Sequence, residues 1–200
     1  MTDFEVKDGV CIIPGGEKKI GYRAFRDCEE LKSIVIPNSV KMIEASAFED
    51  CTGLTEITIP DSVTVIEGFA FAGCTGLTAI TIPNSVQEIG EHAFSCCCGL
   101  TSIEIPASLT TIGDALFNQC DNLTTITVSA GNKKYDSRDN CNAIIETESN
   151  TLIAGCRGTV IPSSVTAIGK GAFEGCTGLT DIAIPDSVVK IGGDAFWGCI

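Results

Sequence analysis

The sequence predicts a β-rich solenoid, in which one short unit is copied along the chain and the copies are stacked. The first observation is a period of 23 residues with the pattern I-P-x-S-V-x-x-I-x-x-x-A-F-x-x-C-x-x-L-x-x-I-x, clearest over residues 59–81. The second is that its Phe and Cys recur in register, at Phe25, Phe48, Phe71, Phe94, Phe117, Phe173 and Phe196, and at Cys28, Cys51, Cys74, Cys97, Cys120, Cys176 and Cys199. A fixed period of this length is typical of a repeat array. One such unit buries too little apolar surface to offset the ordering of its own chain, so stability must come from stacking.

Each unit is expected to contain two short extended stretches. In residues 77–82 the apolar side chains alternate, so Ile80 and Ile82 should point inward and the residues between them outward. Pro83 has no N–H to continue a ladder and should end this strand. A turn then leads to a second extended stretch over residues 86–89.

The repeat register predicts a single domain over residues 1–200, with no room for a separate linker. Residues 1–12 do not match the repeat, and the spacing of Phe4, Val6, Val10 and Ile12 predicts a strand that caps the open end of the core. Regular units are expected over residues 13–127.

The period breaks at residue 128, and the next Ile-Pro pair follows only at Ile161. Residues 128–160 are therefore expected to form an enlarged repeat, in which apolar runs at 142–147 and 151–154 make a hairpin with Tyr135 packed at its base. Regular units resume over residues 161–200. The sequence stops before the Leu and the strand that would complete the last unit, which favours a longer array; the alternative is self-association through this open end.

Charge and cysteine usage narrow the class of protein. The formal net charge is −13, with acidic residues scattered among exposed repeat positions, which argues against nucleic acid or an anionic membrane as partner. No apolar run is long enough to span a bilayer. Of the 12 cysteines, those in register are expected to be buried thiols. Those outside the register could pair or react: Cys11, Cys96, Cys98, Cys141 and Cys156.

The chain shows no constellation typical of an enzyme, and we expect no catalytic residue, cofactor or bound metal. His92 is the only histidine and is expected at the surface. With Cys96, Cys97 and Cys98 it offers soft zinc ligands, but their spacing does not suit a tetrahedral site. The oxygen ligands of residues 136–142 lack the spacing of a calcium loop and are expected to form turns instead.

The pattern L-x-x-I-x-I-P-x-S-V-x-x-I-G-x-x-A-F-x-x-C resembles the BspA-like family of leucine-rich repeat proteins over residues 13–200, and the enlarged unit also resembles the family in its N-x-x-Y-x-S and T-L-I-A-G-C elements. The resemblance implies a right-handed, curved leucine-rich-repeat solenoid with a parallel sheet on its concave face and short strands and turns on the convex face. It also implies a secreted or cell-surface location and adhesion to host or neighbouring-cell proteins. The N-terminus lacks the basic start and apolar core of a signal peptide, so an intracellular, cytoplasmic location is the alternative.

The leading functional hypothesis is a non-enzymatic adhesion or protein-binding module within a longer surface protein. Its partner would be a host extracellular-matrix or surface protein, or a glycan. The alternative is a structural spacer or self-assembling stalk with no ligand of its own. The candidate partner-binding residues point outward from the expected concave strands: Ser33, Glu56, Thr58, Ala79, Thr81, Ser102, Glu104, Thr125, Thr127 and Asp181. The candidate contact loop is the basic cluster of the enlarged repeat: Lys133, Lys134, Tyr135 and Arg138.

Overall fold

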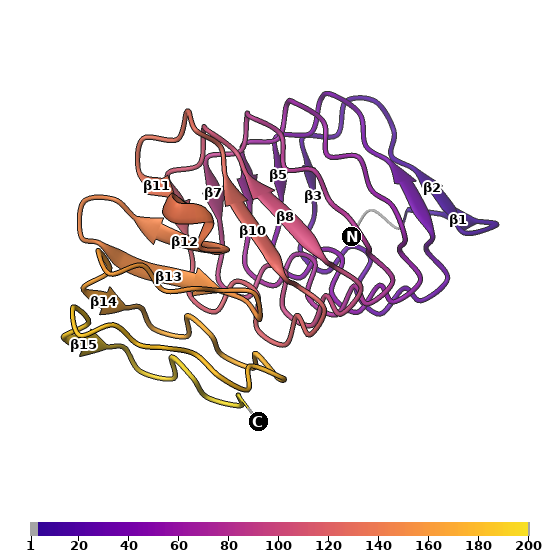
Figure 1. The fold of residues 1–200 in the computed structure, drawn as a ribbon. Coiled ribbons are helices and arrows are strands. Elements are labelled where there is room, and N and C mark those ends of the chain that lie inside the picture. The colour runs from indigo at the N-terminus through magenta and orange to yellow at the C-terminus, as the bar shows by residue number, and fades with distance from the viewer. Residues whose placement is uncertain (1–3, 200) are drawn as a thin grey trace.

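The computed structural model describes residues 4–199, so residues 1–3 of the expected cap and Ile200 at the open end lie outside the described residues. The chain forms a stack of similar turns running from the N-terminus to the C-terminus (Figure 1). A row of paired short parallel strands shows the repeat directly: β3 (Lys19–Ile20), β5 (Met42–Ile43), β6 (Val65–Ile66), β7 (Glu88–Ile89) and β9 (Thr111–Ile112). Within this row, residues 23 positions apart are partners, as in Ile43 with Ile66 and Ile66 with Ile89. The solenoid and its repeat are therefore confirmed.

Strands on the other side of each turn come just before the Ile-Pro pairs. They are β2 (Val10–Ile12), β4 (Ser33–Val35), β8 (Ser102–Ile105) and β10 (Thr125–Val128). β2 pairs with β4 and β8 pairs with β10, in both cases in parallel. The equivalent residues 56–58, 79–81 and 181–183 follow the same course without forming ladder strands, so the expected parallel sheet is interrupted on this side.

The proline that ends each regular unit explains part of this interruption. Proline has no N–H and cannot donate to the neighbouring turn. The enlarged unit carries Ser129 at that position, and its N–H donates to the Ile105 carbonyl at 2.9 Å. The ladder between β8 and β10 therefore gains a bond that the Ile-Pro units cannot make.

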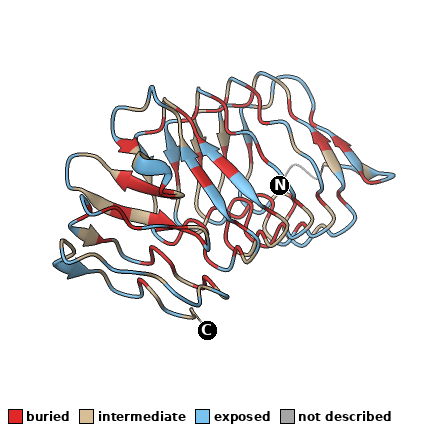
Figure 2. Cartoon of the chain, in the orientation of Figure 1, coloured by how far each residue is buried: buried red, intermediate tan, exposed pale blue. Residues whose placement is uncertain are grey.

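The core is a ladder of identical buried side chains. Buried segments recur from turn to turn along the stack (Figure 2). The Phe25 and Phe48 rings lie 5.3 Å apart between centroids, and the Phe48 and Phe71 rings lie 5.2 Å apart, with both pairs nearly parallel. Beside them the repeated thiols also stack, and Cys74 Sγ donates to the Phe48 carbonyl at 3.2 Å. All 12 cysteines are free thiols. In the register, Cys28 and Cys199 are half-buried and the others are buried, as expected.

The enlarged repeat contains the predicted hairpin. Its strands β12 (Ala143–Glu146) and β13 (Thr151–Gly155) pair antiparallel, and β11 (Tyr135–Asp136) adds a third strand that the sequence did not indicate. A short 3-10 turn, η1 (Arg138–Asn140), joins β11 to the hairpin. Tyr135 is buried at the base, as predicted, and its hydroxyl donates to the Thr110 carbonyl at 3.2 Å.

From β13 the parallel pairing continues through β14 (Ala167–Ile168) to β15 (Lys190–Ile191). A second apolar cluster underlies this part of the chain, centred on Leu152, Ile168 and Phe173. In the last turn the packing loosens, and four large apolar side chains are exposed: Ile184, Val189, Ile191 and Trp197.

The N-terminal cap differs from the single strand that we expected. The chain reverses at Asp8-Gly9, where both residues have positive φ, and β1 (Val6–Lys7) pairs antiparallel with β2. Cys11 pairs in register with the buried Ile34 and is the buried residue of β2, whereas Val10 and Ile12 point outward. Phe4 does cap the core, since its ring stacks on that of Phe25 at 5.5 Å.

Candidate functional site

The outward side chains of the segments that precede the Ile-Pro pairs form one continuous surface, which we call the Ile-Pro face. Ile34, Ile80, Ile103 and Ile126 point into the core from these segments, so alternation places their neighbours outside. The residues predicted for this surface lie where expected: Glu56, Thr58, Ala79, Thr81, Ser102, Glu104, Thr125, Thr127 and Asp181 are exposed, and Ser33 is half-buried.

A hollow of about 720 Å³ lies in the middle of the Ile-Pro face. It brings together Thr58, Thr81 and Glu104 from three successive turns, and Asp61 and Asn84 from the turns after the prolines. No basic side chain is among its lining residues within the described part of the chain, so its charge is negative. Threonine hydroxyls and carboxylates give this hollow hydrogen-bonding capacity without chemical reactivity.

One buried hydroxyl beside the hollow has no hydrogen-bond partner in the described residues. Ser62 and Ser108 occupy the same position in neighbouring units and each donates to a backbone carbonyl at 2.6 Å. The Ser85 hydroxyl oxygen is buried but has no such partner among residues 4–199, although the residue lines the hollow. It is an unsatisfied polar atom beneath this surface.

The Ile-Pro face has an apolar end, of which the sequence placed Val35 outward but not Val10 and Ile12. Val10 is 40% exposed, Ile12 70% and Val35 55%, and these three side chains stand side by side on the paired strands β2 and β4. Aligning Ile12 by the Ile13-Pro14 pair that follows it would have placed it outward, in register with Val35. The face therefore runs from an apolar end to a polar, acidic middle.

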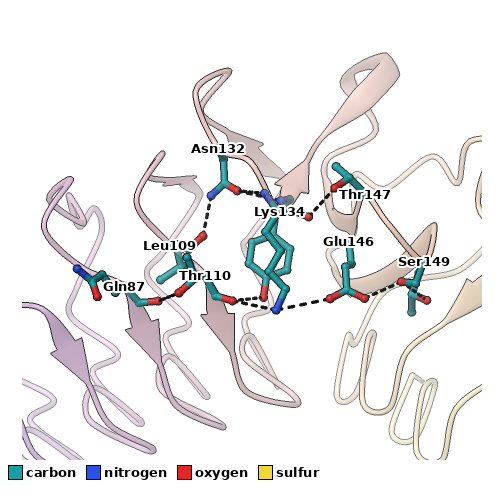
Figure 3. A network of polar contacts seen from close by, with 10 residues as sticks. Gln87, Leu109, Thr110, Asn132, Lys134, Glu146, Thr147 and Ser149 are labelled. Atoms are coloured by element: carbon teal, nitrogen blue, oxygen red, sulfur yellow. Dashed lines mark hydrogen bonds and ion pairs between the residues drawn. The ribbon is translucent and has the colours of Figure 1, made fainter.

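The candidate contact loop is largely engaged in contacts within the chain (Figure 3). Tyr135 is buried, and Lys134 Nζ donates to the Thr110 carbonyl at 3.0 Å and lies 3.7 Å from Glu146 Oε1. The Asn132 side chain holds the loop to the preceding unit by donating to the carbonyls of Pro106 and Leu109. These contacts connect the enlarged repeat to the preceding unit.

Arg138 is similarly engaged. Its guanidinium donates to both carboxylate oxygens of Asp136, at 2.8 and 2.6 Å, and to the Asn150 side chain at 2.8 Å. The hydrogen bond that Arg138 donates to the Asp136 carboxylate raises the pKa of Arg138. Lys133 is exposed, and it is the one residue of this cluster of four for which no hydrogen bond or ion pair is found in residues 4–199.

The candidate zinc ligands do not converge on one site; they are His92, Cys96, Cys97 and Cys98. Cys97 is buried in the thiol ladder, where its Sγ donates to the Phe71 carbonyl, while Cys96 Sγ donates to Gln119. His92 is half-buried, and its ring stacks on Phe69 at 4.8 Å. Within residues 4–199 there is no group of three or more acidic, histidine or cysteine side chains arranged to hold a metal ion.

A second hollow, of about 540 Å³, lies on the opposite side of the stack, on the outer surface of β5, β6, β7 and β9. Its lining includes Met42, Val65, Glu88 and Phe69. The periodicity did not single out this surface, because its outward residues differ from unit to unit. We call it the five-strand face, after the row β3, β5, β6, β7 and β9.

Comparison with known proteins agrees with this architecture. Residues 12–145 and 154–200 match the model of the BspA type leucine-rich repeat region, in six copies. The stretch between them, 146–153, is the tip of the β12–β13 hairpin. A search of curated proteins returned no match. Within residues 4–199 no helix has the length and apolar character of a membrane span.

Solved structures of bacterial repeat proteins are similar over nearly the whole chain. A leucine-rich repeat protein from Eubacterium ventriosum aligns with a TM-score of 0.84 and 25% identity, over 96% of this chain and 51% of the other. The pneumococcal vaccine antigen PcpA aligns with a TM-score of 0.82 and 25% identity, over 96% of this chain and 49% of the other. A leucine-rich cell surface protein from Faecalibacterium prausnitzii aligns with a TM-score of 0.51 and 29% identity, over 98% and 68%. The chain thus spans about half the length of the first two proteins.

Proposed function

Because the chain belongs to the BspA-type leucine-rich repeat family, we propose that it is a protein-binding module that acts at a cell surface and holds its partner along the Ile-Pro face. The observation that carries the proposal is the hollow of about 720 Å³ in that face, where polar and acidic side chains from successive turns converge on one surface. A rigid stack presents such groups at fixed spacing, so many weak contacts can add up without ordering the binding surface first.

The surface location is supported by two of the similar structures, of which one is a cell surface protein and the other a vaccine antigen. The partner class we favour is an extracellular-matrix or host surface protein, with a glycan as the second class. The apolar end formed by Val10, Ile12 and Val35 offers the kind of anchor that the polar middle lacks, since tightly held partners usually bury an apolar contact.

The contacts of Lys134, Tyr135 and Arg138 within the chain make the basic loop the weaker candidate. Each of these side chains would have to leave an existing hydrogen bond before it could contact a partner. The Ile-Pro face requires no such rearrangement, and we therefore place the partner there.

The test is surface plasmon resonance against extracellular-matrix proteins and glycans, using the chain and its double variant Glu56→Lys/Glu104→Lys. Both glutamates are exposed, so the variant should fold. We expect saturable binding that the variant weakens by about tenfold or more, because two carboxylates on the face are reversed in charge. Circular dichroism of both proteins verifies the fold.

The matched control is Glu29→Lys/Glu148→Lys, which makes the same change in net charge at exposed positions outside the Ile-Pro face. Equal weakening in both variants would show a non-specific charge effect and contradict the proposal. Full binding by both variants would exclude the Ile-Pro face as the site. If the chain binds none of the ligands, the spacer or stalk alternative is favoured.

A further inference from the structure

The second hollow, on the five-strand face, combines the Phe69 ring, close-packed backbone at Gly90 and Gly113, and the exposed carboxylates of Glu88 and Glu91. The glycines occupy the Ile-Gly position of the repeat pattern, whereas Phe69, Glu88 and Glu91 lie at positions that vary between units. This hollow is separate from the Ile-Pro face.

Phe69 lines the hollow, and its backbone conformation is energetically unfavourable. Its φ is +58°, a left-handed backbone conformation that is rare for a bulky residue. Its side chain is 37% exposed, and its ring stacks on that of His92 at 4.8 Å with 15° between planes. At the same position the preceding unit has Ser46, the following unit has His92 and the one after it has Ala115, so the units of Ser46 and Ala115 fold without an aromatic ring there. The fold therefore does not require Phe69, which points to a role in binding.

Glycines make the floor of the hollow. A Cβ at Gly90 would lie 2.3 Å from the Gly68 nitrogen, and a Cβ at Gly113 would lie 2.2 Å from the Glu91 nitrogen. Adjacent turns approach so closely here that no side chain fits. The result is an area of close-packed backbone, and Met42, Val65 and Phe69 also line the hollow.

Three carboxylates line the hollow: Glu67, Glu88 and Glu91. Glu67 accepts the Ala45 N–H at 2.8 Å, and Glu88 and Glu91 are exposed. None of the three forms an ion pair within residues 4–199, whereas Lys19 and Lys170 pair with Glu44 and Asp114. No basic side chain lines the hollow in the described part of the chain. Its charge is therefore complementary to a cation.

We propose that this hollow binds an arginine side chain of a protein partner, with the guanidinium stacked on Phe69 and paired with Glu88 and Glu91. A guanidinium is planar and weakly hydrated, so it can lie against a single aromatic ring while donating to carboxylates at its edge. Lysine suits the site less well, because a strongly hydrated ammonium gains more from an aromatic cage than from one wall. An anionic ligand would be repelled by the carboxylates.

The experiment is an NMR titration with a blocked pentapeptide in which two arginines alternate with glycines. A peptide with neutral citrulline in place of arginine serves as the comparison. We expect shifts at the Phe69 and His92 rings and at the Gly90 amide with the arginine peptide, and much smaller shifts with citrulline. Shifts confined to other residues, or tighter binding of the citrulline peptide or of a neutral oligosaccharide, would overturn the proposal.

Two variants test the named contacts. Phe69→Ser copies the residue of the preceding unit and should weaken peptide binding by about tenfold while the protein stays folded. Glu88→Gln/Glu91→Gln should weaken it by a similar factor of about ten. The control Glu29→Gln/Glu148→Gln makes the same charge change at exposed positions outside both faces and should leave the affinity within about twofold. Equal loss in both double variants, or unchanged affinity in Phe69→Ser, would refute the site.

Discussion

At the repeated cysteine position, the thiols of Cys51, Cys74, Cys97 and Cys120 are buried in the core and each donates a hydrogen bond to a backbone carbonyl. Cys51 Sγ donates to the Phe25 carbonyl at 2.9 Å, and Cys120 Sγ donates to the Phe94 carbonyl at 3.0 Å. Burial disfavours the thiolate and raises the pKa of Cys51 and Cys176 to about 12. The pKa values of Cys74, Cys97 and Cys120 are raised well above 9.0 for the same reason.

These pKa shifts predict a loss of stability in alkaline solution. Below pH 9.0, the ordinary pKa of a thiol, both folded and unfolded chains keep these protons. Between pH 9.0 and about 12 the unfolded chain loses protons that the folded chain retains, so the free energy of unfolding falls as the pH rises. Urea denaturation at pH 8 and pH 10.5 should show a lower midpoint at the higher pH.

A matched variant separates the thiols from other alkaline effects. Cys74→Ala/Cys97→Ala removes two buried thiols, so its midpoint should change less between the two pH values than that of the parent chain. An equal change in both proteins would contradict the role of the thiols. Iodoacetamide labelling at pH 8 provides a second readout, in which the half-buried Cys96 and Cys98 should react before Cys74 and Cys97.

At the scale of single elements, the spacing between turns depends on glycine as much as on the strands. Gly53, Gly76 and Gly99 occupy the corner before the Leu of successive units, and a Cβ at each would lie within 2.6 Å of a carbonyl oxygen of the previous turn. Glycine recurs at this corner because the stack brings two backbones into contact there. The repeat pattern shows the glycines, but the distance between the backbones of neighbouring turns is seen only in the structure.

Gly90 gives the sharpest test of this close approach. In Gly90→Ala the new Cβ would lie 2.3 Å from the backbone nitrogen of Gly68, which cannot move aside as a side chain could. We expect a loss of about 3 kcal/mol in the free energy of unfolding, measured by urea denaturation. Gly15→Ala is the control, because nothing lies within 4 Å of its new Cβ. That variant should stay within about 0.5 kcal/mol of the parent, and similar losses in both would contradict the explanation.

The enlarged repeat shows what an element can contribute beyond the pattern. Its hairpin was predictable, since two apolar runs flank a turn sequence. The role of its basic residues was not, because the sequence shows four residues near one another without showing the carbonyls and carboxylates that face them. Thr110, which accepts from both Lys134 and Tyr135, belongs to the preceding unit and lies 24 and 25 residues away.

For the whole molecule, stability should be distributed unevenly along the stack. In a repeat array each unit is stabilised mainly by its neighbours, so a unit with one neighbour opens more easily. Ile43, Ile66 and Ile89 in the central turns are at most 1% exposed, whereas Ile191 in β15 is 51% exposed. Within residues 4–199, β15 pairs on one side only, with β14.

Native-state hydrogen exchange should resolve this gradient. We expect the amides of β15 and β14 to exchange faster than those of β5, β6 and β7, by about a hundredfold or more, because opening the end exposes less apolar surface. Phe71→Ala, which empties a fully buried position in the ladder, should accelerate exchange throughout the central turns. Uniform exchange along the whole chain would show instead that the stack opens as one unit.

The sequence by itself determined the solenoid, its period, the buried Phe and Cys ladders, the hairpin of the enlarged repeat and the outward residues of the Ile-Pro face. These follow from periodicity, because a side chain that recurs every 23 residues must occupy the same place in every turn. The tertiary structure decided the features that do not recur from unit to unit. It paired β1 with β2 through the Asp8-Gly9 reversal and connected the basic loop to Thr110.

The hollow on the five-strand face is also a feature that only the tertiary structure decided. Phe69, Glu88 and Gly113 occupy different positions in three different units, and they share a surface only because successive turns stack on one another. Periodicity identifies what the units have in common. Binding surfaces arise where the units differ, and the distances between unlike residues are set by the stack and not by the repeat.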